Sequence, residues 1–323
     1  MRGKRLVVCL AVALVVAPGI GWGAAAFPER EVTVIVPTSA GGGSDLTMRA
    51  IARATEPILG KPVVVVNRPG AGGAIGHAEI ARAKVDGYQL GMLLQQMTIV
   101  PMMRPEVPYR WTDFKPIIMI NADAAALIVR EGGRWNTLKE FVEYVQKNPG
   151  VVTVADCGVG CIWQIAAAGF ASTAKLKVNH VPFEGAAPER IALLGGHVDA
   201  MVASVPEVAD QVRAKKMRIL AVMDERRDPN FPDVPTLKEQ GYPVSIVAWR
   251  AIGGPKDLPD DLVKKLHDAF RQGMQQAAYT DFMKKQGLGI VYKGTEDTAK
   301  FIDQERKDFK ALLKSLGLLK LED

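Results

Sequence analysis

The segment Glu31-Val-Thr-Val-Ile-Val36, followed by Pro37-Thr-Ser-Ala-Gly-Gly-Gly-Ser-Asp45, decides the fold of this chain. Its first half is rich in β-branched residues, which predicts a buried strand. Its second half is a glycine-rich turn, and the pattern after it predicts a helix from about Asp45 to Ile58. A strand, a tight turn and a helix in this order are typical of an α/β fold.

The same order recurs along the chain. A strand at 63–66 is followed by a helix that ends near residue 83 and by a strand at 90–94. We expect further strands at 124–129, 151–155, 179–182, 198–203 and 219–222, and further helices at 138–146, 162–174 and 188–194. The C-terminal third predicts helices at 260–278, 281–286 and 295–315. This alternation predicts parallel sheets covered by helices on both faces.

The length of the chain predicts two lobes, because 323 residues exceed the usual size of a single hydrophobic core. We place lobe 1 at residues 27–123, lobe 2 at residues 124–224, and a return to lobe 1 with the C-terminal helices at residues 225–323. No low-complexity linker separates the lobes. We therefore expect the chain to cross between them more than once.

Residues 1–26 have the features of a secretory signal peptide. Three basic residues among the first five precede an apolar run at 6–20, and the small residues at 24–26 predict cleavage before Phe27. The run is short for a membrane span, which needs about 20 apolar residues; a retained N-terminal anchor is the alternative. The sequence therefore predicts a periplasmic protein, in a compartment where disulfides persist.

The distribution of charge argues against nucleic acid as the partner. The chain has 41 Lys and Arg against 35 Asp and Glu, and these charges are scattered without long runs of one sign. After the predicted signal peptide, no stretch reaches the length of a membrane span. We therefore expect a soluble extracytoplasmic protein.

Cys157 and Cys161 are the two cysteines that follow the predicted signal peptide. They can form a disulfide if the glycines between them fold the chain back tightly. Two free thiols are nearly as well supported, and a metal site is the weakest alternative because no His lies nearby in sequence. The pattern slightly favours the disulfide and predicts no metal.

Three glycine-rich turns follow predicted strands, at 37–45, 68–76 and 157–161. The backbone N–H groups of the first can converge on an anion, although Ser44 or Asp45 can equally cap the helix. The second resembles a dinucleotide fingerprint with altered spacing, and we interpret it as structural, with no cofactor. If the first and third turns belong to different lobes, two helix N-termini face each other across a cleft and can grip both ends of a dicarboxylate.

The sequence offers little support for catalysis. The four histidines, His77, His180, His197 and His267, form no metal-ligand pair and accompany no nucleophile motif. Asp199 starts an apolar strand, where it can order water at a cleft mouth or cap the strand. The side chain of Trp249 can line a cleft or pack in the core.

The order of several short motifs resembles the receptors of tripartite tricarboxylate transporters, the Bug family. The resemblance covers nearly the whole chain after the predicted signal peptide. It rests on Val34-Ile-Val-Pro37 with Gly41 to Asp45, on 63–76, Asp86-Gly87-Tyr88, 113–116 and 148–150, and on Val181-Pro182-Phe183, 194–199 and 232–236.

The resemblance implies a two-lobed periplasmic binding protein of the type II, Venus-flytrap kind, with a ligand cleft between the lobes and no catalysis. It implies a small organic acid as ligand and integral membrane transporter subunits as partners, and we expect a monomer. The candidate ligand-binding residues are Thr38, Ser39, Ala40, Gly41, Gly42, Ser44, Asp45, Gln96, Gly158, Gly160, Cys161, Gln164, Phe183, Glu184, Asp199 and Trp249.

This sequence departs from the family pattern on one side of the expected cleft. Where similar receptors often have Gly-Ser-x-x-His it has Gly160-Cys-Ile-Trp-Gln164, and Glu184 stands where they often have a basic residue. Both changes disfavour a second anionic group, provided that Glu184 faces the cleft rather than solvent. We therefore expect a monocarboxylate, an aromatic acid or an amine-bearing acid rather than citrate. A receptor for a signalling partner and an extracytoplasmic α/β enzyme are the alternatives.

Overall fold

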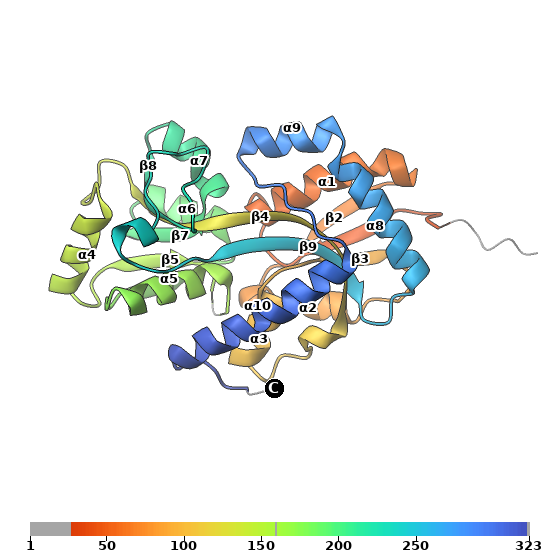
Figure 1. The fold of residues 1–323 in the computed structure, drawn as a ribbon, viewed down its shortest axis with the longest axis horizontal. Helices are drawn as coiled ribbons and strands as arrows, with labels where there is room; N and C mark the ends of the chain where they lie inside the picture. Colours follow the sequence, from red (N-terminus) through yellow and green to blue (C-terminus); the bar gives the residue numbers. More distant parts are fainter. Residues whose placement is uncertain (1–26, 159, 322–323) are drawn as a thin grey trace, which may run out of the picture.

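The computed structural model describes residues 27–158 and 160–321 of the chain (Figure 1). The predicted signal peptide at residues 1–26 lies outside them. Within the described residues, no helix is both long enough and apolar enough to cross a membrane. Figure 1 shows two groups of helices and strands side by side, connected by the long strands β4 and β9.

Nine strands form one continuous sheet in the described part of the chain, in the order β2-β1-β3-β9-β4-β7-β5-β6, with β8 paired to β4. Their bounds are β1 Val32–Val36, β2 Val63–Asn67, β3 Gln89–Leu93, β4 Phe114–Arg130, β5 Thr153–Asp156, β6 Asn179–Pro182, β7 Ala200–Ser204, β8 Met217–Met223 and β9 Val247–Pro255. The strands β1, β2 and β3 pair in parallel, as do β5, β6 and β7.

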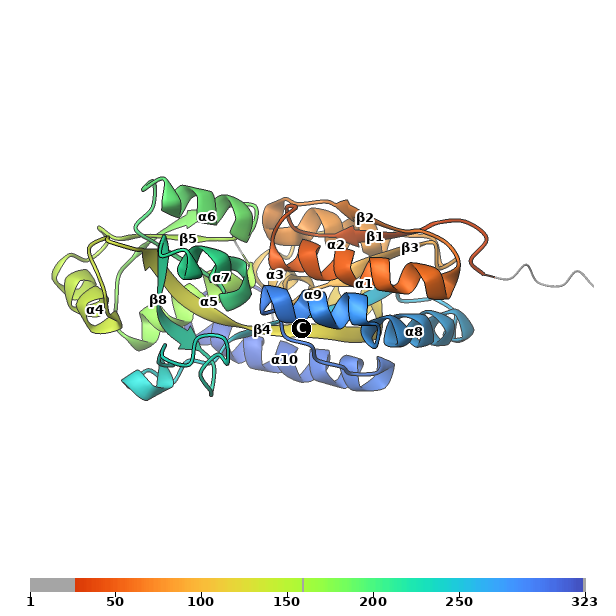
Figure 2. The same ribbon diagram turned by 90° about the horizontal axis from the view of Figure 1, so that it is seen from above.

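Helices flank the sheet in both lobes, as expected for strands that are apolar on both faces (Figures 1 and 2). Their bounds are α1 Gly43–Leu59, α2 Ala74–Ala81, α3 Gln96–Met103, α4 Leu138–Lys147, α5 Ile162–Thr173, α6 Ala186–Leu194, α7 Val205–Arg213, α8 Asp260–Met274, α9 Ala277–Gln286 and α10 Thr295–Ser315. The α/β fold class and the two-lobed architecture are thus confirmed.

The strand β4 carries the chain from lobe 1 into lobe 2. Its residues 114–124 pair with β9, whereas residues 125–130 pair with β7 and β8. All of these pairings are antiparallel, and so is that of β3 with β9. The expectation of purely parallel sheets is therefore wrong, because the two crossing strands run against their neighbours.

The return to lobe 1 begins later than residue 225, where the sequence placed it. Leu237, Val244 and Ile246 are still buried in the core of lobe 2. The chain re-enters lobe 1 with β9, which starts at Val247. This region lacks long helices or strands before β9, so the sequence pattern gave no signal for its boundary.

The last helix, α10, packs against both lobes (Figure 2). Ile302 is buried in a cluster of lobe 1, whereas Phe309 and Leu313 are buried in the main core of lobe 2. The spacing of these residues keeps them on one face of the helix. Burial of each such side chain contributes about 1.5–3 kcal/mol to stability. The helix α10 therefore stabilises the contact between the lobes, along the side where β4 and β9 cross.

Candidate ligand-binding site

The carboxyl ends of the parallel strands from both lobes meet at a narrow cleft. The chain lines it with Thr38, Ser39, Gly42, Ser44, Leu94, Gln95 and Gln96 from lobe 1, Cys157, Ile162, Trp163, Gly185, Ala186 and Glu207 from lobe 2, and Ala248, Trp249 and Arg250 from β9. Ligands of open α/β sheets bind at such strand ends. The free volume of the cleft is about 30 Å³, so the lobes lie close together here.

A larger hollow of about 860 Å³ lies on lobe 1 alone, between α2 and the segments around Tyr88 and Arg104. Its described lining residues all belong to lobe 1. Among helices of eight or more residues, α2 alone begins at this hollow. Polar side chains line this hollow as well, so neither its size nor its polarity decides between the two. Position favours the interlobe cleft, because ligands of open α/β sheets bind at the carboxyl ends of the strands.

The turn between β1 and α1 is shaped by Asp45. The carboxylate of Asp45 accepts a hydrogen bond from the Gly41 amide at 2.9 Å and forms an ion pair with Arg49, also at 2.9 Å. Gly41 has a φ of 81°, which a residue with a side chain rarely adopts. Asp45 therefore stabilises the turn without lining the cleft. In the same turn, the buried Thr38 Oγ1 has no hydrogen-bond partner in the described residues.

The start of α3 places two glutamines in the cleft. Gln95 donates a hydrogen bond from Nε2 to the carbonyl oxygen of Val247 at 2.9 Å, which ties lobe 1 to β9. The side chain of Gln96 is buried, and its Oε1 has no hydrogen-bond partner among the described residues. Gln96 therefore presents a desolvated acceptor to the cleft, and such a group gains most from a ligand that donates.

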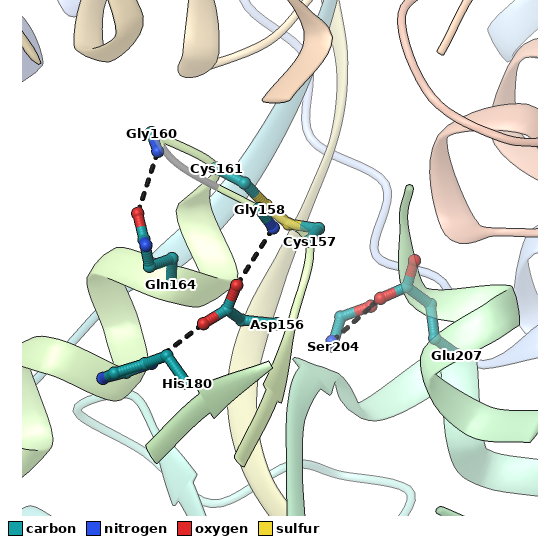
Figure 3. Close-up of a disulfide and its surroundings, with 9 residues drawn as sticks. All are labelled: Asp156, Cys157, Gly158, Gly160, Cys161, Gln164, His180, Ser204 and Glu207. Carbon is teal, nitrogen blue, oxygen red and sulfur yellow. Dashed lines mark hydrogen bonds and ion pairs between the residues drawn. A yellow bond between two sulfur atoms is a disulfide. The ribbon is translucent and has the colours of Figure 1, made fainter. Parts of the chain in front are cut away.

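The turn between β5 and α5 is fixed by Asp156 and a disulfide (Figure 3). The carboxylate of Asp156 accepts a hydrogen bond from the Gly158 amide at 3.0 Å and contacts His180 at 2.9 Å. Cys157 and Cys161, with Cα atoms 5.5 Å apart, are joined by the disulfide. Cys161 is the N-cap of α5 and makes no side-chain capping bond, and the first turn of α5 has no acidic residue. The N-terminus of α5 is therefore free to receive an anion.

Replacing Cys157 and Cys161 together by serine is expected to lower the free energy of unfolding by about 2 kcal/mol, because a short crosslinked loop restricts the unfolded chain. Urea unfolding of the variant and of the parent checks this. The intact mass of the parent should rise by two hydrogen atoms on reduction under denaturing conditions. An unchanged mass would contradict the disulfide.

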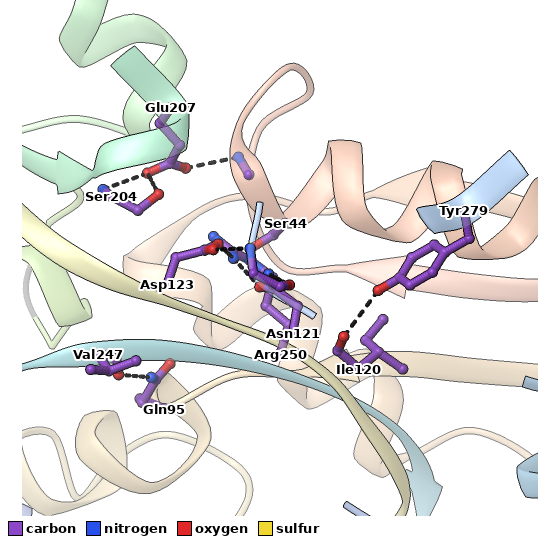
Figure 4. A network of polar contacts seen from close by, with 12 residues as sticks. Ser44, Gln95, Ile120, Asn121, Asp123, Ser204, Glu207, Val247, Arg250 and Tyr279 are labelled. Carbon is purple, nitrogen blue, oxygen red and sulfur yellow. Dashed lines mark hydrogen bonds and ion pairs between the residues drawn. The ribbon is translucent and has the colours of Figure 1, made fainter. Parts of the chain in front are cut away.

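Glu207 connects the two lobes at the N-terminus of α1 (Figure 4). Its Oε1 accepts a hydrogen bond from the Gly43 amide at 2.8 Å, and its Oε2 accepts from the amide and the hydroxyl of Ser204 at 3.0 and 2.9 Å. The contact with Ser204 completes a capping box at the start of α7. A carboxylate of the protein itself thus occupies the helix N-terminus that the sequence assigned to a ligand.

Arg250 is a buried cation on β9 at the floor of the cleft (Figure 4). It forms an ion pair with Asp123, donates a hydrogen bond to Asn121, and donates from Nε to Ser44 Oγ at 3.1 Å. Burial raises the pKa of Asp123, and the charge of Arg250 opposes this rise. The pair therefore brings little net charge into the cleft.

Comparison with known proteins places the chain in a family. The family model described as "Tripartite tricarboxylate transporter family receptor" matches residues 47–318. The chain belongs to this family. A UPF0065 protein of Cupriavidus necator is 31% identical over 299 residues, which cover 92% of this receptor and 90% of the relative. BugT of Bordetella pertussis is 29% identical and covers 90% of each chain.

Two solved structures of similar proteins match the receptor over their length. The periplasmic binding protein BugD is 30% identical, with a TM-score of 0.88 over 91% of the receptor and 100% of BugD. MatC of Rhodopseudomonas palustris, solved with bound malate, is 27% identical, with a TM-score of 0.85 over 89% of the receptor and 100% of MatC. The family resemblance found in the sequence is thus confirmed.

The structure brings together six of the predicted site residues of the receptor at the cleft: Thr38, Ser39, Gly42, Ser44, Gln96 and Trp249. Others shape the two turns without lining the cleft, namely Ala40, Gly41, Asp45, Gly158, Gly160, Cys161 and Gln164. Gln164, for example, accepts a hydrogen bond from the Gly160 amide at 2.9 Å. Trp249 both lines the cleft and fills the core, and its Nε1 donates to Glu305.

Three predicted site residues have side chains that do not line the cleft. Asp199 accepts hydrogen bonds from the amide and hydroxyl of Thr153 at 2.9 and 2.8 Å, at the amino ends of the strands, which is the opposite edge of the sheet. The side chain of Glu184 is exposed, and only its carbonyl oxygen reaches lobe 1, where it accepts from the Ser39 amide at 3.2 Å. Phe183 packs against the core of lobe 2.

Sequence reasoning missed Gln95, Glu207 and Arg250. The pattern Ser204-x-x-Glu207 is a capping box, which could have located a helix start at a strand end. Arg250 is a single cation in the apolar run 247–255, and a lone charge in a buried strand needs a partner. Neither pattern identifies the residue that Glu207 or Arg250 contacts, because these contacts join distant segments: Glu207 and Gly43 are 164 residues apart.

Proposed function

We propose that this receptor captures a small organic carboxylate between its lobes and delivers it to the membrane subunits of a tripartite tricarboxylate transporter. The observation that carries the proposal is the α5 N-terminus, which lies at the cleft without an acidic residue in its first turn and without a side-chain cap. Free N–H groups and the helix dipole at such a terminus bind carboxylates. The malate bound to the similar protein MatC supports this class of ligand.

Binding requires the lobes to separate and close again. The free volume of about 30 Å³ is far below the roughly 300–1,000 Å³ of a usual ligand pocket. Movement about β4 and β9, the strands that cross between the lobes, opens the cleft in the manner of a hinge. We propose that the receptor is exported through cleavage of residues 1–26 and acts in the periplasm as a monomer without catalysis.

We further propose that the ligand is a monocarboxylate, an aromatic acid or an amine-bearing acid rather than citrate. Glu184 does not support this preference, because its side chain is exposed. Trp163 and Ile162 support it, since both line the cleft and make its lobe 2 side apolar. Glu207 supports it more strongly, because its carboxylate already occupies one helix N-terminus.

A thermal-shift panel tests the proposed function. The purified receptor without residues 1–26 is mixed with monocarboxylates, aromatic acids, amino acids, dicarboxylates and citrate. A true ligand at 100 times its Kd is expected to raise the free energy of unfolding by about 2.7 kcal/mol, and citrate to have no effect. Stabilisation by none of these acids, together with turnover of some substrate, would refute the receptor function.

A further inference from the structure

One carboxylate that lines the cleft has no ion pair in the described residues, although the Arg250 guanidinium lies near it: a Cβ added at Gly43 would be 2.5 Å from Arg250 Nη2 and 3.1 Å from Glu207 Oε1. Among the described residues that line the cleft, Arg250 and Glu207 are the charged side chains. Arg250 is neutralised by Asp123. The carboxylate of Glu207 instead accepts hydrogen bonds from uncharged donors, the Gly43 amide and the amide and hydroxyl of Ser204. Arg190 contacts the carbonyl oxygen of Glu207 at 2.7 Å, and no ion pair to the carboxylate is seen in the described chain.

The two helix N-termini that flank the cleft are therefore unequal. At α1, Glu207 already supplies the anion, 2.8 Å from the Gly43 amide. At α5, neither a side-chain cap nor an acidic residue fills the first turn. One carboxylate of a ligand can bind at α5, whereas a second one directed to α1 would meet the charge of Glu207.

Unpartnered acceptors also face this space. Gln96 is 4% exposed, lines the cleft, and has no hydrogen-bond partner for its Oε1 within the described residues. A buried acceptor without a donor costs free energy that a donating ligand recovers. Gln96 and Glu207 are therefore both expected to bind a ligand group that has several N–H donors.

Acidic groups continue behind the cleft in lobe 2. Glu189 on α6 is fully buried, and neither of its carboxyl oxygens has a hydrogen-bond partner in the described part of the chain. Burial, and then the nearby carboxylates of Glu207 and Asp156, raise the pKa of Glu189 well above its ordinary value. Asp156 itself contacts only a histidine among ionisable groups, at 2.9 Å. The raised pKa favours the protonated, neutral form of Glu189, so this residue adds no negative charge beside Glu207.

We infer that Glu207 and Gln96 form an ammonium subsite, so that the cleft takes a zwitterionic amino acid. Its carboxylate binds at the N-terminus of α5 and its ammonium group beside Glu207, the residue that determines the charge of the ligand. This inference rests on the proposed receptor function and narrows its ligand class. A dicarboxylate of the same length is disfavoured, because its second carboxylate and Glu207 repel each other in a partly desolvated site.

Isothermal titration calorimetry with matched acids tests the inference. The probes are norvaline and 5-aminopentanoate with their amine-free counterpart pentanoate, phenylalanine with 3-phenylpropanoate, and glutarate as the dicarboxylate. At least one amine-bearing acid is expected to bind about tenfold or more tightly than its amine-free counterpart and than glutarate, because a charge-assisted hydrogen bond is lost without the amine.

The variant Glu207→Gln is expected to weaken binding of that amino acid about tenfold or more and to strengthen binding of glutarate. Glutamine preserves the capping box at the start of α7, so the variant should fold. Glu184→Gln is the matched control, because it removes a carboxylate near the cleft whose side chain is exposed, and it should leave the ranking unchanged.

The inference is overturned if glutarate binds the parent protein more tightly than every amine-bearing probe. It is also overturned if Glu207→Gln gives the same ranking as Glu184→Gln. Failure of every mono-, di- and tricarboxylate to bind would instead refute the receptor function, and the inference would fall with it. The two failures are thus distinguishable by whether any carboxylate binds.

Discussion

Replacing Arg250 by methionine is expected to lower the free energy of unfolding by about 3–5 kcal/mol. Arg250 and Asp123 are both buried and form an ion pair, so the substitution leaves the Asp123 carboxylate without its counter-charge. It also removes the hydrogen bonds of Arg250 to Asn121 and Ser44. Urea unfolding followed by circular dichroism measures the loss as a lower midpoint with an unchanged slope.

The double variant Arg250→Met with Asp123→Asn is the control for this prediction. It removes both charges while the amide oxygen can still accept from the Gly289 amide, which contacts Asp123 at 2.7 Å. It should recover much of the lost stability, because an uncompensated buried charge costs more than a missing ion pair. A double variant as unstable as Arg250→Met alone would show that the pair itself is not the cause.

Local patterns predicted β1 and α1 well. The expected strand 31–36 and helix 45–58 are observed as Val32–Val36 and Gly43–Leu59. Both elements depend on residues close in sequence: a β-branched run that is buried on both faces, and an apolar stripe that begins after a glycine turn. The family resemblance and the two-lobed α/β fold followed from many such segments in the right order.

The first half of β4 was not predicted, since its sequence does not look like a strand. Pro116 interrupts it, and Asn121 and Asp123 are polar although buried. These polar residues are explained by Arg250, which lies 129 and 127 residues further along the chain. A local pattern cannot show that a charge will be supplied by a distant strand.

The same limitation applies to the site. The glycine turns at 37–45 and 157–161 were predicted to face each other, and both contribute residues to the cleft. The carboxylate of Glu207 at α1 was not predicted, because only the closed arrangement of the lobes brings it to Gly43. The sequence thus predicted which turns meet at the cleft, whereas the charges of the cleft depend on contacts between the lobes.

The stability of the receptor is expected to fall as the pH rises from about 4.5 to about 8, and the buried Glu305 on α10 is one cause, beside the other carboxyl groups whose pKa burial raises. Burial, with a smaller contribution from Asp308, raises the pKa of Glu305 to about 8, against the opposing effect of the Trp249 N–H that donates to it. The folded state therefore retains a proton that the unfolded state releases near pH 4.5. This stabilisation is complete below the pKa of the unfolded chain and is lost as pH rises through the folded-state pKa.

The expected loss is on the order of 4 kcal/mol between pH 5 and 9, since one pKa unit corresponds to about 1.4 kcal/mol. Glu305→Gln keeps an acceptor for Trp249 but cannot ionise, so urea unfolding of this variant should lose less stability over the same range. Glu296→Gln, an exposed position on α10, is the matched control and should follow the parent. Equal pH profiles for all three proteins would exclude Glu305. The Trp249 N–H favours the ionised form of Glu305, so the expected loss of stability comes from the burial of that charge and not from a weaker contact with Trp249.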